Sequence, residues 1–269
     1  MPLRILGSAI LFVAIWFCLW AFGQSGAVLI MAFFAIGSQI ELCRLMKNFH
    51  ATPARRQLLV WTAVIIFGSW YLRPMHAGIW LSVVAAVWIL VCGVAKLRPE
   101  QLLNYLAPTL FAIFYVPFSM QFGILLLRSC ESGTFMLGWT VLVSKLGDIG
   151  GLIVGGGIGR HPLAAEYSPK KTWEGFFGAI AAATAGGFSL CILASWFCDF
   201  PIPLWLSMPL GAIIAAVGAA ADLLESALKR HAKIKDSGRI IPGIGGCLDL
   251  CDSLFLTLPT TYAVLEFFL

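Results

Sequence analysis

Charged residues are scarce in this sequence. Asp, Glu, Lys and Arg make up only 12% of the 269 residues, whereas an ordinary globular domain has about 25%. Hydrophobic residues make up 60% and the mean hydropathy is +0.91. The sequence also lacks a polar linker, a low-complexity tail and any segment with the composition of a soluble domain. These absences exclude a soluble globular protein and indicate an integral membrane protein.

Metal-ligand spacing is also lacking among the eight cysteines. Cys247 and Cys251 are four residues apart, with no histidine partner pattern nearby, so a zinc site is not expected. Most cysteines lie in apolar runs, where they are expected to act as small apolar packing residues. The signature of a cleavable signal peptide is missing too. The first apolar run follows Arg4 and is followed at once by a second, which predicts a retained signal anchor.

Long apolar runs dominate the chain. A helix needs about 20 apolar residues to cross a bilayer core, and the runs lack the alternation typical of a transmembrane barrel. The fold class is therefore an all-α polytopic integral membrane protein with about nine transmembrane helices. The segments are 4–22, 26–43, 58–72, 77–95, 102–127, 134–158, 174–197, 203–225 and 248–268. The third segment is short, and Pro108 and Pro117 predict a kink or break in the fifth.

Lysine and arginine are distributed unevenly between the two sides that nine segments define. One side holds Arg4, Arg44, Lys47, Arg55, Arg56, Lys96, Arg98, Arg160, Lys170, Lys171, Lys229, Arg230, Lys233, Lys235 and Arg239. The other side holds Arg73 and Arg128, and Lys145 lies inside the sixth segment. Cytoplasmic loops carry the excess of positive residues, which predicts a cytoplasmic N-terminus and an outside C-terminus. We expect residues 1–100 to form four N-terminal spans and 101–269 a catalytic region with cytoplasmic loops 159–173 and 226–247.

Carboxylates inside apolar segments are costly and mark functional sites. Asp148 lies in the sixth segment, three residues after Lys145. Two further acidic pairs have a spacing of three, which places both members on one helix face; they are Asp222 with Glu225, and Asp249 with Asp252. Two such pairs could bind a divalent cation such as Mg²⁺, which takes oxygen ligands and shares them with phosphates. The alternative is an interfacial role, with each carboxylate paired to a nearby Lys or Arg.

The segment between the two acidic pairs is basic and rich in glycine. It contains Lys229, Arg230, Lys233, Lys235 and Arg239, together with Gly238, Gly243, Gly245 and Gly246. Glycines let backbone N–H groups approach phosphate oxygens closely, so the segment is typical of a polyphosphate site. Attraction of the cations to anionic lipids and a helix-capping turn built from the glycines are the alternatives.

A second polar segment, residues 166–178, is "EYSPKKTWEGFFG". Ser168-Pro169 predicts a turn, and Thr172 can cap a helix that begins at Trp173. Lys170 and Lys171 stand just before that helix N-terminus, an arrangement that favours anion binding. Considered alone, the segment fits an ordinary capped helix with cytoplasmic lysines equally well.

These segments closely resemble the phosphatidate cytidylyltransferase (CDP-diacylglycerol synthase) family. The family motif S-P-K-K-T-W-E-G appears without a mismatch at 168–175, and Asp148 matches the aspartate upstream of it. The C-terminal signature is carried by Ser226, Leu228, Lys229, Arg230, Lys235, Asp236, Gly238, Ile241, Pro242, Gly245, Gly246, Asp249 and Asp252. The resemblance covers roughly residues 100–269. Two positions depart from it: Ile244 replaces a histidine and Leu250 an arginine.

The resemblance implies transfer of a cytidylyl group from CTP to phosphatidate, which gives CDP-diacylglycerol and pyrophosphate, with Mg²⁺ as cofactor. The implied catalytic residues are Asp222, Asp249, Asp252, Lys229 and Lys235. The implied substrate-binding residues are Ser168, Lys170, Lys171, Thr172, Ser226, Arg230, Gly245 and Gly246. The Mg²⁺ ligands would be Asp222, Asp249 and Asp252, with Glu225 and Asp148 as further candidates.

Expected partners are CTP, phosphatidate or a similar lipid phosphate, and membrane lipids. A homodimer is also expected, and nucleic acid is not. The expected location is the cytoplasmic or inner membrane of a bacterium, with the active site facing the cytoplasm. Alternatives are a polyprenol or phytol kinase, a cytidylyltransferase for another lipid phosphate, and a non-catalytic paralogue. A transporter is a further alternative, against which stand the lack of internal repeats and the clustering of charge at one membrane face.

Overall fold

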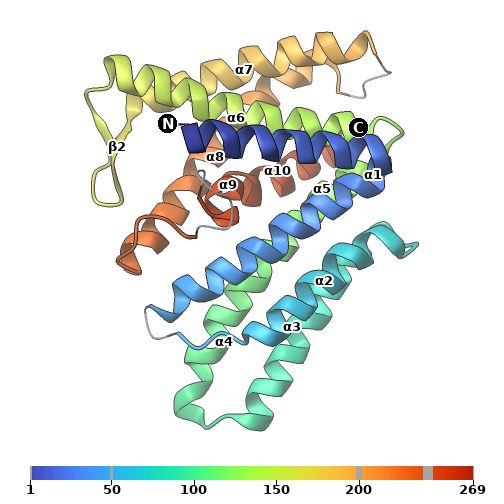
Figure 1. The fold of residues 1–269 in the computed structure, drawn as a ribbon, viewed down its shortest axis with the longest axis vertical. Coiled ribbons are helices and arrows are strands. Elements are labelled where there is room, and N and C mark those ends of the chain that lie inside the picture. Colours follow the sequence, from blue (N-terminus) through green and yellow to red (C-terminus); the bar gives the residue numbers. More distant parts are fainter. Residues whose placement is uncertain (1, 49–50, 198–201, 239–244, 269) are drawn as a thin grey trace. The chain divides into compact units, whose positions relative to one another are not determined.

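The fold was analysed in a computed structural model that describes residues 2–48, 51–197, 202–238 and 245–268; side chains are described from residue 10 on, Leu11 excepted. Helices make up almost all of it (Figure 1). The elements are α1 (Pro2–Lys47), α2 (Arg55–Tyr71), α3 (Ala77–Lys96), α4 (Pro99–Ile113), η1 (Phe114–Phe118), α5 (Ser119–Ser129), α6 (Gly133–Ile158), β1 (Pro162–Ala164), β2 (Ser168–Thr172), α7 (Trp173–Ser195), α8 (Leu204–His231), α9 (Cys247–Cys251) and α10 (Leu254–Phe268). The all-α fold class is confirmed.

The chain divides into two compact units, and each is discontinuous in sequence. The first comprises residues 1–125 and 228–251, and the second comprises 126–227 and 252–269. The division expected from the sequence, into residues 1–100 and 101–269, separates N-terminal spans from a catalytic region and is not based on packing. It stays a prediction.

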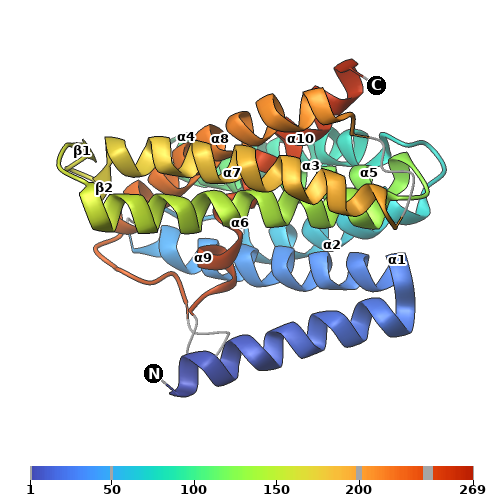
Figure 2. The same cartoon turned by 90° about the horizontal axis from the view of Figure 1, so that it is seen from above.

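In the first unit, α1 is a long helix that bends at Gly23. This residue has φ 55° and ψ −131°, a backbone conformation that glycine adopts without steric cost. The bend divides α1 into two arms (Figure 2). The arms correspond to the apolar segments predicted at 4–22 and 26–43. The second arm packs against α2 and α9, α2 packs against α3, and α3 packs against α4.

The break predicted in the fifth apolar segment is confirmed. Helix α4 contains Pro108, and a five-residue π-helix, η1, follows it and contains Pro117. Proline removes one backbone donor and its ring crowds the preceding turn. The π-turn accommodates this interruption before the helix resumes as α5.

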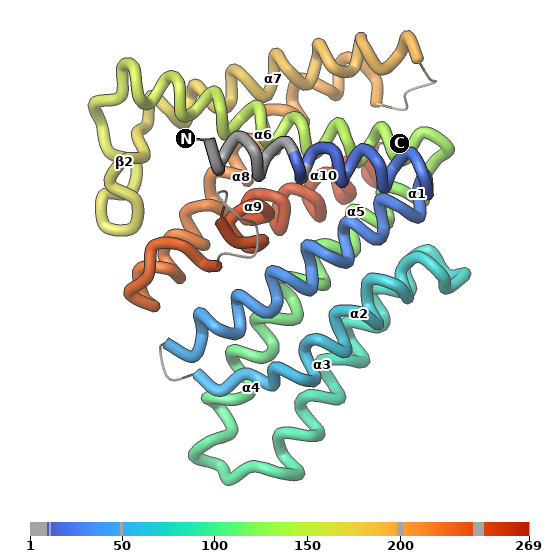
Figure 3. The backbone as a smooth tube through the Cα atoms, in the orientation of Figure 1, coloured from blue at the N-terminus to red at the C-terminus, as the bar shows by residue number. Residues whose placement is uncertain are grey.

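In the second unit, α6 and α7 lie side by side along most of their length (Figures 1 and 2). Their contact is made by small residues, which let two helix backbones approach closely. A Cβ on Gly151 would lie 3.3 Å from the carbonyl oxygen of Gly175. The β1–β2 hairpin joins the end of α6 to the start of α7 and projects beyond both helices (Figure 3). It lies within the polar loop expected at 159–173.

Large apolar side chains cover the outer surfaces, as expected of helices that face lipid. Trp80 is 68% exposed and Leu152 is 77% exposed. Within the described residues, six helices are long and apolar enough to cross a membrane. The bent α1 contributes one of these six, although it has two arms. Helices α2 and α10, with 17 and 15 residues, are shorter than the roughly 20 residues that span a bilayer core. The chain is thus a multi-pass membrane protein, and the count of nine stays a prediction.

Seven cysteines fall within the described residues and all seven are free thiols. Cys43, Cys191, Cys247 and Cys251 are buried, in keeping with the predicted packing role. Cys198 lies outside the described residues.

Candidate functional site

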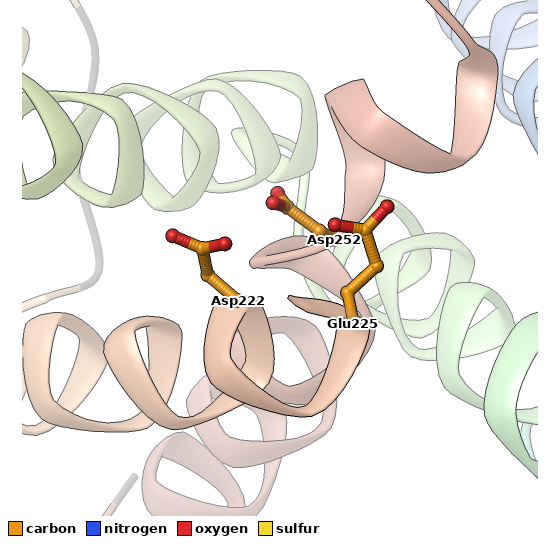
Figure 4. Close-up of side chains that lie close together, drawn as sticks. All are labelled: Asp222, Glu225 and Asp252. Atoms are coloured by element: carbon orange, nitrogen blue, oxygen red, sulfur yellow. The ribbon is translucent and has the colours of Figure 1, made fainter. Parts of the chain in front are cut away.

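Three acidic side chains of the second unit gather at one point. Asp222 and Glu225 come from the same face of α8, and Asp252 comes from the turn before α10 (Figure 4). One carboxylate oxygen of each lies within 4.8 Å of the other two. Glu225 is fully buried, and the side chain of Asp252 is only 14% exposed. The spacing of three in Asp222 and Glu225 does place both on one face, as predicted.

Two lysines accompany this cluster. The Lys171 ammonium lies 2.6 Å from Asp222 Oδ2 and donates to the Ala219 carbonyl at 3.4 Å. The Lys145 ammonium lies 3.0 Å from Asp148 Oδ2 and 4.0 Å from Asp252 Oδ1. Asp148 therefore joins the cluster through Lys145. Four carboxylates and two ammonium groups have a formal charge of −4 + 2 = −2 when all are ionised.

A cavity of about 360 Å³ opens beside the cluster. Its polar lining consists of Ser144, Asp148, Lys170, Lys171, Thr172 and Asp222. The remaining wall consists mainly of small and apolar residues of α6, α7 and α8. The volume lies within the range of about 300–1,000 Å³ typical of ligand pockets. The cavity thus offers charged groups and an apolar wall to one ligand.

The base of the hairpin that carries Lys170 and Lys171 is tied to the start of α7. Thr172 is the N-cap of this helix, and its Oγ1 accepts a hydrogen bond from the Gly175 N–H at 3.1 Å. The predicted cap is confirmed. The Glu174 carboxylate accepts hydrogen bonds from the Arg160 and His161 N–H groups at 3.1 and 3.2 Å, and it contacts His161 Nδ1 at 2.6 Å. These contacts tie the base of the hairpin to α7.

In the first unit, Asp249 is surrounded by hydrogen-bond donors. Its Oδ1 lies 3.0 Å from the Lys229 ammonium. Its Oδ2 accepts from the backbone N–H groups of Ser237 and Gly246, both at 3.1 Å. The Gly246 N–H therefore serves Asp249 here. Asp249 and Asp252 fall in different units, and the metal-ligand role of Asp249 stays a prediction.

The glycines of the basic segment have local structural reasons to be glycine. Gly245 has φ +134°, a conformation that other residues rarely adopt. A Cβ on this residue would also lie 3.3 Å from Asp249 Oδ2. Gly243, Arg239 and the departure Ile244 lie outside the described residues. Leu250, the other departure, lies in α9.

The other predicted substrate-binding residues are distributed over both units. Ser168 lies at the start of β2, and Ser226 in α8, both half-buried in the second unit. Arg230 and Lys235 are exposed in the first unit. Their substrate roles stay predictions.

Glu41 is a buried acidic residue that the sequence interpretation missed. It lies in the second arm of α1 and is fully buried. It accepts hydrogen bonds from the Leu248 N–H at 2.8 Å and from Ser237 Oγ at 3.3 Å. A signal was available, because Glu41 is a carboxylate inside the apolar segment 26–43 and such residues mark functional sites.

The three-carboxylate cluster fits a divalent metal ion. Mg²⁺ prefers carboxylate oxygens and is often shared with substrate phosphates. Carboxylates at such close range repel one another unless a cation lies between them. Asp222, Glu225 and Asp252 are the residues that would hold Mg²⁺.

Comparison with known proteins identifies the family. The sequence profile of the Cytidylyltransferase family matches residues 2–268. The chain belongs to this family. The phosphatidate cytidylyltransferase of Staphylococcus saprophyticus is 34% identical to this chain over 192 residues, which cover 69% of this chain and 71% of the relative. That of Staphylococcus aureus is 29% identical over 244 residues and 88% of its length.

The extent of the match differs between these cytidylyltransferases. The Mycobacterium bovis enzyme of the same name is 33% identical over 167 residues, which cover 62% of this chain. The match spans about half of the mycobacterial relative, 53% of its length. The staphylococcal relatives match over most of theirs.

Proposed function

We propose that this protein transfers the cytidylyl group of CTP to phosphatidate. A phosphate oxygen of phosphatidate attacks the α-phosphorus of CTP and forms the new P–O bond. The bond from the α-phosphorus to the oxygen bridging it to the β-phosphorus breaks, and pyrophosphate leaves with the electron pair. The products are CDP-diacylglycerol and pyrophosphate.

The three-carboxylate cluster beside the cavity carries this proposal. Lys170 and Lys171 of the hairpin line the cavity, and Asp222 belongs both to the cluster and to the cavity wall. The phosphate of phosphatidate is already an anionic nucleophile, so strong base catalysis is not required. The main obstacle is the approach of two polyanions, and cations held in a water-poor site oppose their repulsion.

Individual side chains have distinct roles in this proposal. Lys170 and Lys171 bind phosphate oxygens, and the Thr172 cap keeps both lysines at the N-terminus of α7. Lys145 holds Asp148 and Asp252 in position. When bound by Asp222, Glu225 and Asp252, Mg²⁺ supplies positive charge that neutralises phosphate oxygens. The apolar part of the cavity wall suits the lipid end of phosphatidate better than it suits the triphosphate of CTP.

We further propose that the chain crosses the membrane nine times. Nine spans, with a cytoplasmic N-terminus, place the 159–173 and 226–247 loops on the cytoplasmic side, where CTP is available. The uneven distribution of Lys and Arg supports this orientation. The relatives are bacterial, which supports location in a bacterial cytoplasmic membrane. The protein acts as a homodimer in this proposal, as the family resemblance implies.

Product analysis tests the reaction. The purified, detergent-solubilised protein would be given CTP, Mg²⁺ and phosphatidate in mixed micelles, with the Asp252→Asn variant as control. We expect pyrophosphate release that depends on phosphatidate and is lost in the variant. Release of CDP with a lipid alcohol as acceptor would replace the proposal with a lipid kinase. No turnover by folded protein with any lipid phosphate or alcohol would favour a non-catalytic member of the family.

A further inference from the structure

Glu41 joins the N-terminal half of the chain to the basic segment near its C-terminus. Its Oε2 accepts from the Leu248 N–H at 2.8 Å and from Ser237 Oγ at 3.3 Å, across 207 and 196 residues of sequence. Both partners belong to the same compact unit as Glu41. The carboxylate thus contacts the described residues on either side of 239–244 at once.

Two glycines of the basic segment, Gly238 and Gly246, lie directly against this carboxylate. A Cβ on Gly238 would overlap Glu41 Oε1, and a Cβ on Gly246 would overlap Glu41 Oε2. The carboxylate is fully buried, so it has little room to move away from an added methyl group. A side chain at either position would therefore displace the Glu41 carboxylate, and at Gly246 it would also meet Ser237 Oγ.

Asp249 holds the same residues from its own position in α9. The Ser237 N–H donates to Asp249 Oδ2 while the Ser237 hydroxyl donates to Glu41. The Gly246 N–H donates to Asp249, and Asp249 in turn pairs with Lys229 at 3.0 Å. Ser237 and Gly246 are thus fixed between two carboxylates, one of which orients a lysine.

We propose that Glu41 is a positioning residue, which holds Ser237, Gly246 and Leu248 so that Asp249 and Lys229 keep the arrangement needed for substrate binding. This inference rests on the proposed cytidylyltransferase function, in which Lys229 and Gly246 belong to the phosphate-binding segment. Glu41 itself contacts no substrate. Glu41 affects the reaction indirectly. It accepts from the Leu248 N–H, and by fixing this part of the chain it keeps the Ser237 and Gly246 N–H groups in place to donate to Asp249.

Paired variants of the full-length protein test the proposal. Glu41→Met keeps most of the volume and removes both acceptors, whereas Glu41→Gln keeps one carbonyl oxygen for the Leu248 N–H. Gln39→Met is the matched control, because Gln39 is equally buried in α1 and bonds Cys43 rather than the basic segment. Each variant would be measured for pyrophosphate release and for hydrogen–deuterium exchange at the Ser237, Gly246 and Leu248 amides.

We expect Glu41→Met to lower kcat/KM about 10- to 100-fold, the range for groups that orient ligands, and to speed exchange at the three amides. Glu41→Gln should recover part of both, and Gln39→Met should change neither. Fast exchange with unchanged kcat/KM would reduce Glu41 to a structural role and overturn the proposal. Lost activity with unchanged exchange would overturn it as well.

The two measurements also separate this inference from the proposed function. If the unmodified protein released no pyrophosphate, the proposed reaction would fail. The exchange rates would still decide whether Glu41 holds the basic segment, and unchanged rates in Glu41→Met would refute that independently.

Discussion

Asp249 and Asp252 are three residues apart in sequence and have opposite surroundings. Asp249, in the first unit, faces donors: the Lys229 ammonium and the N–H groups of Ser237 and Gly246. Asp252, in the second unit, faces acids, since carboxylate oxygens of Asp222 and Glu225 lie within 4.8 Å. Lys145, at 4.0 Å, is the nearby cation of Asp252.

The difference indicates two roles for the aspartates of this sequence motif. A carboxylate that already accepts several hydrogen bonds stabilises the loop that supplies them. A carboxylate crowded by other carboxylates is stabilised by a cation, and a divalent metal with its substrate phosphate suits that place. The comparison therefore predicts a structural role for Asp249 and a metal-binding role for Asp252, although the two share one sequence motif.

The largest effect is expected from Asp252→Asn. The substitution removes one of three carboxylates from the cluster, and we expect kcat to fall about 10³-fold, as for loss of a group that stabilises transition-state charge. The Mg²⁺ concentration needed for half-maximal rate should rise. Initial rates of pyrophosphate release over a Mg²⁺ titration measure both. An unchanged Mg²⁺ dependence would remove Asp252 from the metal site.

Asp249→Asn should have a smaller effect of a different kind. Asn keeps one oxygen that can accept from Ser237 or Gly246 but loses the ion pair with Lys229, and we expect kcat/KM to fall about 10- to 100-fold. The Mg²⁺ dependence should stay that of the unmodified protein. The same Mg²⁺ titration tests this expectation. If Asp249→Asn raised the Mg²⁺ concentration for half-maximal rate as much as Asp252→Asn does, Asp249 would also be a metal ligand, and the two aspartates would not differ in role.

Lys171→Met should weaken the second unit's site more than Lys170→Met. Lys171 is bonded to Asp222 at 2.6 Å, whereas Lys170 is exposed. Loss of a charge-assisted contact costs about 1.5–3 kcal/mol, or about 10- to 100-fold in kcat/KM. Rates at varied CTP and varied phosphatidate would show which substrate each lysine binds. Equal losses would mean that the contact with Asp222 has no special part in catalysis.

Gly245→Ala tests whether the loop beside Asp249 needs the backbone conformation that glycine allows at position 245. The measurement is the thermal stability of the variant. Alanine at φ +134° is strained, and such strain costs about 1–3 kcal/mol. We expect the detergent-solubilised variant to lose structure at a lower temperature. Gly157→Ala is the control, because a Cβ there meets no atom within 4 Å and the residue lies in α6. Equal behaviour of the two variants would contradict the assigned backbone requirement.

Thr172→Ala should give the smallest effect. It removes the side chain that caps α7, which costs about 1 kcal/mol. Thr172→Ser keeps the accepting oxygen and should restore the melting temperature. If serine failed to restore it, the methyl group of Thr172 rather than its hydroxyl would be the stabilising part.

Much of the fold could be predicted because bilayer length and hydropathy govern it directly. Each predicted apolar segment corresponds to helix in the structure, and Pro117 marks the interruption at η1. Thr172 was recognised as a cap because capping depends on local sequence alone. The face shared by Asp222 and Glu225 followed in the same way from helical periodicity.

What could not be predicted depends on contacts between distant parts of the chain. The meeting of Glu41 with Leu248 spans 207 residues, and no periodic pattern encodes it. Asp249 and Asp252 have different surroundings because α9 ends at Cys251, so that Asp249 lies in the helix and Asp252 in the turn that follows. Helical spacing predicted one face for this pair because it assumed an uninterrupted helix.

The fit of Gly238 and Gly246 around Glu41 has an evolutionary consequence. A side chain can be gained at either glycine only in lineages where position 41 has already become smaller, so the order of substitutions is constrained. Among natural variants of this protein, a residue other than glycine at position 238 or 246 should therefore occur only together with a smaller residue at position 41. A single ancestral replacement at position 41 would therefore open paths of sequence change some 200 residues away.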